Sequence, residues 1–120
     1  KDMLDETKKP SVSPESNIQS VIFEISEKRL GVTAVVEDEK IIGIITDGDI
    51  RRMLSKTETI TGITAKDIMT KNPKMVEPNS MVVEALNIME DFSITQLIVS
   101  ENNHYKGVIH LHDILKEGIV

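Results

Sequence analysis

The sequence has no cysteine and no tryptophan, and its aromatic residues are Phe23, Phe92 and Tyr105. Without cysteine, the chain can form no disulfide, thiolate nucleophile or cysteine-ligated zinc site. So few rings argue against the base stacking by which proteins bind single-stranded nucleic acid. The net charge of −6 argues against duplex binding, because nothing offsets phosphate repulsion over a broad face. We therefore expect no nucleic-acid partner and an aliphatic core that contains methionine.

The sequence also lacks a long apolar run and a visible signal peptide. We therefore expect no membrane partner and a cytoplasmic location. No Gly-x-Ser-x-Gly motif or Walker loop is present, so we predict no catalytic residue and no activity for this chain alone. The sequence starts at Lys1 rather than at a methionine. A longer parent protein would explain this start, as would processing or the choice of the expressed segment.

The second half of the sequence repeats the first half at a shift of 64 residues, so that Gly43 falls on Gly107 and Asp49 on Asp113. Apolar residues at positions i, i+3, i+4 and i+7 predict one amphipathic helix in each half. A repeat of this extent outweighs any single motif as a guide to the fold. The helical positions are Ile18, Val21, Ile22 and Ile25 in the first half, and Val82, Ala85, Leu86 and Met89 in the second.

Each half is predicted to fold in the order β-α-β-β-α, which gives an α/β (α+β) protein. The threonine-rich segment 55–64 is the predicted linker, and it divides the chain into domains 1–60 and 61–120. One unit of this size is marginal alone, so the two should pack sheet against sheet about a pseudo-twofold axis, with two related clefts. Ser16 and Ser80 are expected to cap the first helix of each half. The predicted elements are opening turns at 2–4 and 66–70, helices at 17–28, 48–55, 81–92 and 112–117, and strands at 32–36, 41–46, 96–100 and 105–111.

The junction between the strand 41–46 and the helix 48–55 is the first candidate site. Asp47 is expected to cap the helix, so the Thr46 hydroxyl and the Asp49 carboxylate would lie near its positive end. Free backbone N–H groups at such an end suit a sugar phosphate or a nucleotide. Two other interpretations stay open. The carboxylates could serve only the helix end, and Arg52 could pair with Asp49 rather than clamp a phosphate.

The two repeats resemble a pair of CBS domains, the regulatory module often called a Bateman module. The resemblance rests on the order β-α-β-β-α and on the ending Gly-hydrophobic-hydrophobic-Thr-x-x-Asp, or a variant of it, in each half. The opening DIMTKNP at residues 67–73 is also typical of a CBS unit. The resemblance implies that Thr46 contacts a phosphate and that Asp49 accepts hydrogen bonds from ribose hydroxyls. Asp47 and Arg52 complete the predicted first site.

A narrower resemblance is to the C-terminal CBS pair of arabinose-5-phosphate isomerases, which serve the biosynthesis of Kdo for lipopolysaccharide or capsule. It is carried by residues 27–33, 46–52 and 84–89, and above all by GVIHLHDILKEGIV at 107–120. The resemblance implies a preceding sugar-isomerase domain in the same polypeptide and a homodimer of CBS pairs within a tetrameric parent. It also implies that no cofactor is required and that the regulatory ligand is an adenine nucleotide or the sugar nucleotide CMP-Kdo. The alternatives are a structural assembly module without a ligand and a CBS pair attached to a different enzyme.

In the second repeat, His110 stands where Thr46 stands in the first. This departs from the usual CBS pattern, so we expect the second cleft to bind a different anion or a sugar nucleotide through His110, His112 and Asp113. Residues two apart on a strand share a face, which raises the alternative of a metal site. The strand is expected to end between the two histidines, so we predict no metal. A further hypothesis is that these residues reach the active site of a neighbouring catalytic domain.

Overall fold

The computed structural model describes residues 9–116, apart from the side chains of Asp113, Leu115 and Lys116, and the opening turn predicted at 2–4 lies outside the described residues. No helix in the described part of the chain has the length and apolar character needed to cross a membrane. The first repeat contains β1 (Ser11–Val12), α1 (Ile18–Lys28), β2 (Val32–Glu37), β3 (Lys40–Thr46) and α2 (Asp47–Lys56). The second repeat opens with α3 (Ala65–Ile68) and β4 (Thr70–Lys71), followed by β5 (Met75–Val76), α4 (Val82–Phe92), β6 (Gln96–Glu101), β7 (His104–His110) and α5 (Leu111–Lys116).

The strands of each repeat form the same small sheet. A short first strand runs parallel to the second, which then turns back in an antiparallel hairpin. Both hairpin turns, at 38–39 and 102–103, have two successive residues with positive φ, as two-residue hairpin loops prefer. The hairpins meet where Lys40 pairs with His104, which gives the strand order β1-β2-β3-β7-β6-β5. The predicted order β-α-β-β-α is therefore confirmed in both repeats.

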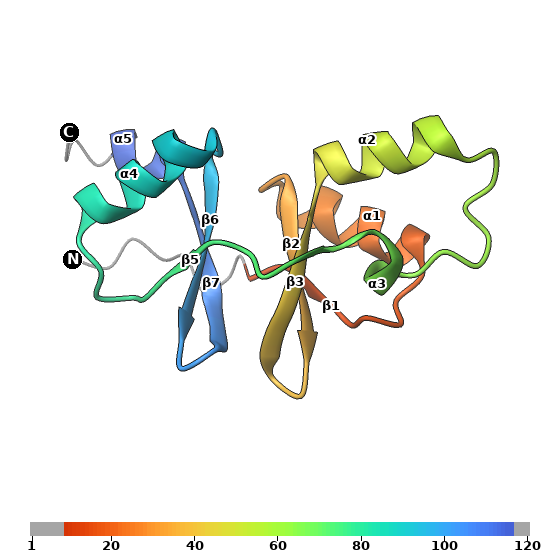
Figure 1. Cartoon of the computed structure of the whole chain (residues 1–120), viewed down its shortest axis with the longest axis horizontal. Coiled ribbons are helices and arrows are strands. Elements are labelled where there is room, and N and C mark those ends of the chain that lie inside the picture. The colour runs from red at the N-terminus through yellow and green to blue at the C-terminus, as the bar shows by residue number, and fades with distance from the viewer. Residues whose placement is uncertain (1–8, 117–120) are drawn as a thin grey trace.

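The two hairpins face each other in the middle of the molecule, and the helices cover their outer faces (Figure 1). Successive side chains of a strand point to opposite faces of the sheet. Along β2, Val35 accordingly packs against the helices, whereas Val32 and Ala34 pack against the other hairpin. This confirms the predicted α/β (α+β) arrangement of two repeats packed sheet against sheet.

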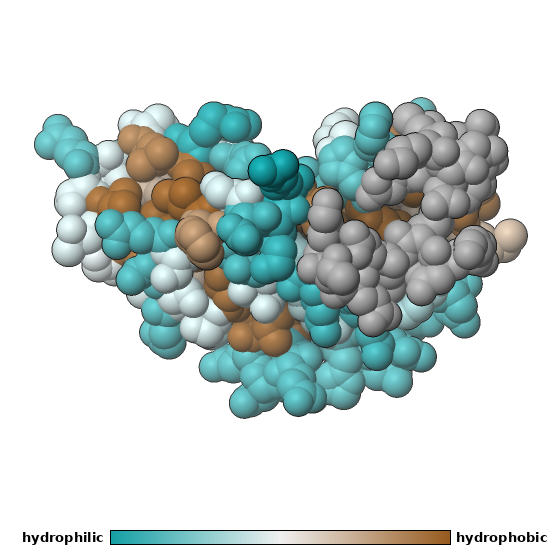
Figure 2. Space-filling view, turned by 180° about the vertical axis from the view of Figure 1, so that it is seen from behind, coloured by the Kyte–Doolittle hydropathy of each residue, from teal (hydrophilic) through white to brown (hydrophobic). Residues whose placement is uncertain are grey.

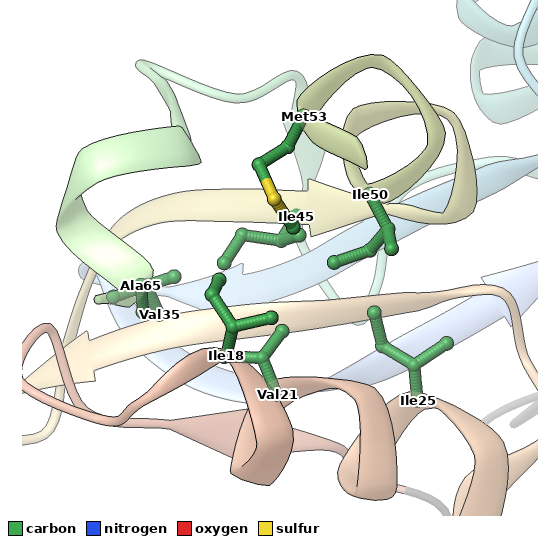
Figure 3. Close-up of a cluster of buried hydrophobic side chains, with 8 residues drawn as sticks. All are labelled: Ile18, Val21, Ile25, Val35, Ile45, Ile50, Met53 and Ala65. Carbon is green, nitrogen blue, oxygen red and sulfur yellow. The ribbon is translucent and has the colours of Figure 1, made fainter. Parts of the chain in front are cut away.

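Three hydrophobic clusters hold this arrangement together. The cluster of the first repeat contains Ile18, Val21, Ile25, Val35, Ile45, Ile50 and Met53, together with Ala65 from α3 (Figure 3). The equivalent cluster of the second repeat contains Val76, Ala85, Met89, Leu97, Val99, Ile109 and Ile114. Between the hairpins lies a shared layer, which contains Leu30, Val32, Ala34, Ile41, Ile98, Tyr105 and Val108. Because both repeats contribute to the shared layer, neither can bury both faces of its sheet alone.

The segment that opens the second repeat packs on the first. Ala65 of α3 belongs to the core of the first repeat, and β4 pairs with β3, with Gly43 opposite Lys71. A Cβ on Gly43 would lie 2.7 Å from the Met69 sulfur and 2.9 Å from the Thr70 carbonyl oxygen. Only a residue without a side chain permits this approach of the two strands. The chain then crosses to the second repeat (Figure 1), and the domain boundary at 60–61 stays a prediction.

The helix caps differ from the predicted ones. Asn17 caps α1, because its side chain accepts a hydrogen bond from the backbone N–H three residues later at 2.8 Å. The hydroxyls of Ser16 and Ser80 instead bind the backbone before the helix. The Ser16 hydroxyl accepts from the backbone N–H of Ser13, and the Ser80 hydroxyl accepts from the backbone N–H of Glu77, each at 3.0 Å. The prediction that these serines cap the helices is therefore wrong, since both hydroxyls fix the turn that precedes the helix.

Candidate functional site

The junction of β3 and α2 is held by reciprocal hydrogen bonds between Thr46 and Asp49. The Thr46 hydroxyl accepts from the backbone N–H of Asp49 at 3.2 Å, and the Asp49 carboxylate accepts from the backbone N–H of Thr46 at 2.9 Å. This is a capping box with Thr46 as the N-cap residue. The prediction that Asp47 caps the helix is therefore wrong. Thr46 is the last residue of β3, and its extended backbone aims its own hydroxyl at the first turn of α2.

The carboxylate of Asp49 is buried and receives three hydrogen bonds. Asp49 is only 9% exposed. Its Oδ2 accepts from the backbone N–H of Thr46 and, at 3.2 Å, from the Thr46 hydroxyl. Its Oδ1 accepts from Nη2 of Arg52 in an ion pair. The pairing of Asp49 with Arg52, one of the two interpretations left open by the sequence, is thus present. The helix cap fixes the negative charge, whereas the positive charge sits on a long side chain.

Thr46, Asp49 and Arg52 line a cavity of about 270 Å³ between the two repeats. The cavity lies where the first turn of α2 faces the end of α4, beside the chain that crosses between the repeats (Figure 1). Seen from behind, the molecule is hollowed between its two halves (Figure 2). The remaining lining residues are Val32 and Ile44 from the first hairpin, Thr70, Asn72, Pro73 and Lys74 from the crossing segment, and Phe92, Ile94, Gln96, Leu97 and Ile98 from the second repeat.

The second repeat supplies an aromatic and an amide side chain to this cavity. Phe92 is 51% exposed, and the Lys74 ammonium lies 4.3 Å from the centroid of its ring. Gln96 donates from Nε2 to the carbonyl oxygen of Leu30 at 2.8 Å, which holds its amide in the cavity wall. Two cations and one carboxylate therefore line a cavity with apolar walls, in a chain whose net charge is −6. Such a lining can hold an apolar ring, a pair of hydroxyls and a phosphate at once.

Asp47, His110 and His112, which were also predicted site residues, do not line this cavity. The backbone N–H of Asp47 donates to the carbonyl oxygen of Gly31 at 3.0 Å. His110 is the last residue of β7, and its Nδ1 accepts from the backbone N–H of His112 at 3.0 Å, so the neutral ring carries its proton on Nε2. The two histidine rings lie edge to face, with their centroids 6.5 Å apart. The side chain of Asp113 lies outside what the structure describes.

The described residues give the histidines no third metal ligand, and the side chain of Asp113 is not among those residues. Among the residues that the structure describes, no group of three or more histidine, aspartate or glutamate side chains could hold a metal ion. His110 instead uses a ring nitrogen to bind the first turn of α5, in the place where Thr46 uses its hydroxyl to bind the first turn of α2.

Sequence reasoning found one side of the cavity and missed the other. Thr46, Asp49 and Arg52 are three residues apart on one helix start, so a local pattern brings them together. Lys74 and Phe92 come from the other repeat, and no local pattern marks them as cavity residues. The available signal was the opening DIMTKNP, because its Asn72 and Pro73 line the cavity and lead directly into Lys74.

The chain belongs to the CBS domain family, whose model matches residues 1–56 and 65–119. Among curated proteins, it is similar to the arabinose 5-phosphate isomerase KdsD of Yersinia pestis, with 39% identity over 95% of this chain and 35% of the relative. It is also 41% identical to KdsD of Francisella tularensis over 89% of this chain and 33% of the relative. The chain thus spans about a third of the length of the curated relatives it matches. Both resemblances expected from the sequence are confirmed.

Solved structures of other proteins have the same fold. A CBS domain protein from Pyrobaculum aerophilum, solved in complex with AMP, superposes with a TM-score of 0.83 at 19% identity, over 98% of this chain and 96% of that one. An uncharacterized conserved protein from Pyrococcus horikoshii gives a TM-score of 0.83 at 24% identity, over 98% of this chain and 89% of that one. At these identities the likeness establishes the fold.

Proposed function

We propose that this chain is a sensor module that binds a nucleoside phosphate between its repeats and regulates an arabinose 5-phosphate isomerase of which it forms a part. The observation that carries the proposal is the cavity, because it gathers the chemistry of such a ligand in one place. The apolar walls suit a base, the Asp49 carboxylate suits a ribose diol, and Arg52 and Lys74 suit a phosphate. The AMP complex of a protein with the same fold supports the choice of ligand class.

Calorimetry with the 120-residue chain tests the sensor. We would titrate AMP, CMP-Kdo and arabinose 5-phosphate, and we expect an adenine nucleotide or CMP-Kdo to bind. In Lys74→Gln the affinity should fall about tenfold, the scale of one charge-assisted hydrogen bond. Lys66→Gln is the matched control, because Lys66 is exposed, pairs with Glu15 and lies away from the cavity. Absence of binding by all three compounds at millimolar concentration would contradict the sensor proposal.

Regulation requires that the ligand prefer one arrangement of the attached enzyme over another. The curated relatives are about three times as long as the region they share with this chain, which leaves room for a sugar-isomerase domain. We would measure isomerase kinetics of the full-length protein with and without the bound nucleotide, in the natural sequence and in Lys74→Gln. A nucleotide effect that Lys74→Gln abolishes supports regulation. If the nucleotide binds the full-length enzyme but leaves its kinetics unchanged, the proposal of regulation is contradicted.

Assembly is the second candidate function. Large hydrophobic side chains are exposed on or beside three helices, and hydrophobic residues reach the surface on the first-repeat half seen from behind (Figure 2). A homodimer of CBS pairs, within a tetrameric parent, would cover such positions. Light scattering of the chain, with and without nucleotide, tests this, and a strictly monomeric chain at high concentration would contradict it. The exposed residues are Phe23, Leu54, Met81, Val83 and Phe92.

A further inference from the structure

We propose that the ion pair between Arg52 and Asp49 is a latch that only a phosphorylated ligand opens. In the closed state Arg52 occupies Oδ1 of Asp49. A ligand phosphate draws the guanidinium away, and the vacated oxygen then accepts hydrogen bonds from the ribose hydroxyls. Arg52 thereby makes the cavity select nucleoside phosphates over the corresponding nucleosides. This inference rests on the proposed sensor function and deepens it.

The hydrogen bonds of Asp49 show why a ligand must displace Arg52. A carboxylate oxygen has two lone pairs in its plane. Oδ2 uses both of them, for the backbone N–H of Thr46 at 2.9 Å and for the Thr46 hydroxyl at 3.2 Å. Oδ1 gives one lone pair to Arg52 and has one left. A vicinal diol brings two donors, so it can bind through Oδ1 with both of them only when Arg52 leaves.

The two partners of the pair differ in how firmly they are held. The Asp49 side chain is 9% exposed and stays fixed by the capping box, whereas the Arg52 side chain is 67% exposed. Release of Arg52 therefore leaves the carboxylate with its two bonds from Thr46 and with the positive end of α2. Because the guanidinium is largely in water, its pair with Asp49 contributes little net free energy. An anion that binds the guanidinium more strongly than Asp49 does can therefore open the latch.

A phosphate is the group best suited to compete. The planar guanidinium fork binds two phosphate oxygens at once, which makes the new pair stronger than the old one. The guanidinium lies over the start of α2, where a Cβ on Gly48 would be 3.5 Å from its Nη1. An anion that reached Arg52 would therefore also approach the helix end that favours negative charge. A nucleoside lacks this group and has to displace Arg52 without compensation.

Calorimetry with two matched ligand pairs tests the latch. AMP is compared with adenosine, and CMP with cytidine, so the result does not depend on which base the cavity prefers. For the natural chain we expect the phosphate to raise affinity by about tenfold or more, the scale of one charge-assisted hydrogen bond. In Arg52→Gln we expect the nucleoside to bind more tightly, because the carboxylate is open, and the nucleotide to bind less tightly. The preference for the nucleotide over the nucleoside should then fall by about tenfold, and the preference that remains is the part that Lys74 supplies.

Arg51→Gln is the matched control, since it removes the same charge from the adjacent position of α2 and lies outside the cavity. It should keep the preference of the natural chain. If the natural chain binds the nucleotide and Arg52→Gln keeps the full preference, or weakens nucleoside and nucleotide alike, the latch is wrong and the sensor stands. If the natural chain binds none of the four compounds, both the sensor proposal and the latch proposal are contradicted.

Discussion

Replacement of Gly43 by alanine should destabilise the chain at the strand pair that carries the crossing segment. The new Cβ would lie 2.9 Å from the Thr70 carbonyl oxygen and 2.7 Å from the Met69 sulfur. The methionine can yield, but the carbonyl belongs to β4 and moves only with the strand. Overpacking of this kind costs about 1–3 kcal/mol. For a domain of this length, about 2.1 cal/mol/K of unfolding entropy per residue converts each kcal/mol to about 4 °C in Tm.

Thermal unfolding followed by circular dichroism measures this loss, and Gly48→Ala is its control. Gly48 lies in the first turn of α2, where a Cβ meets nothing closer than 3.5 Å. The same change should therefore stabilise the chain by about 0.5–1 kcal/mol, through helix propensity and a less flexible unfolded state. In Gly43→Ala, amide hydrogen exchange should become faster at β3 and β4, because these strands hold the lost stability. An unchanged Tm in Gly43→Ala, or a loss equal in both variants, would refute the reasoning.

Two further predictions concern single hydrogen bonds. Thr46→Ala should lose about 1 kcal/mol of stability, because it removes the hydroxyl that caps α2. Thr46→Ser keeps a capping hydroxyl and should keep most of that stability, so equal melting temperatures of the two variants would contradict the prediction. Tyr105→Phe should lower the free energy of unfolding, measured in urea, by about 0.5–1.5 kcal/mol, because it removes the hydrogen bond that the Tyr105 hydroxyl donates to the Pro10 carbonyl oxygen at 2.7 Å. The loss stays in this range because the Pro10 oxygen still accepts from the Ala34 N–H and is not left unsatisfied. Burial, and then the charge of Glu24, raise the pKa of Tyr105 above 10.0, so the bond stabilises fully below pH 10 and its contribution fades as the pH rises further. The difference in unfolding free energy between the natural chain and Tyr105→Phe should therefore shrink above pH 10. A difference that grows there would contradict the assigned role of this hydrogen bond.

Most of the fold follows from local patterns in the sequence. Apolar spacing predicted α1 and α4 to within one residue at each end, because the buried face of a helix repeats at 3.6 residues. The caps were harder, because Ser16 and Asn17 are adjacent and both side chains can bind a free N–H. The same ambiguity separates Thr46 from Asp47. For α2, the residue that caps the helix depends on where β3 ends, and the pairing of β3 with β2 places that end at Thr46.

The candidate site could be predicted only in part, for a physical reason. Asp49 and Arg52 meet because they are three apart on a helix, and the sequence states that spacing directly. Phe92 and Lys74 reach the same cavity through the packing of one hairpin on the other, which involves contacts between distant parts of the chain. The crossing segment adds a second difficulty, since Thr70 belongs by sequence to one repeat and pairs with the strand of the other.

The shared layer between the hairpins also has a consequence for how such a chain can have originated. A protein with a single repeat would expose the face that carries Val32 and Ala34, and a second copy related by a true twofold axis could cover it. In such a homodimer every substitution would alter both clefts at once. Once two repeats are joined in one chain, the axis is only approximate and each repeat can change alone. Thr46 and His110 occupy equivalent places in the two repeats, and each binds the first turn of the helix that follows, one with a hydroxyl and the other with an imidazole.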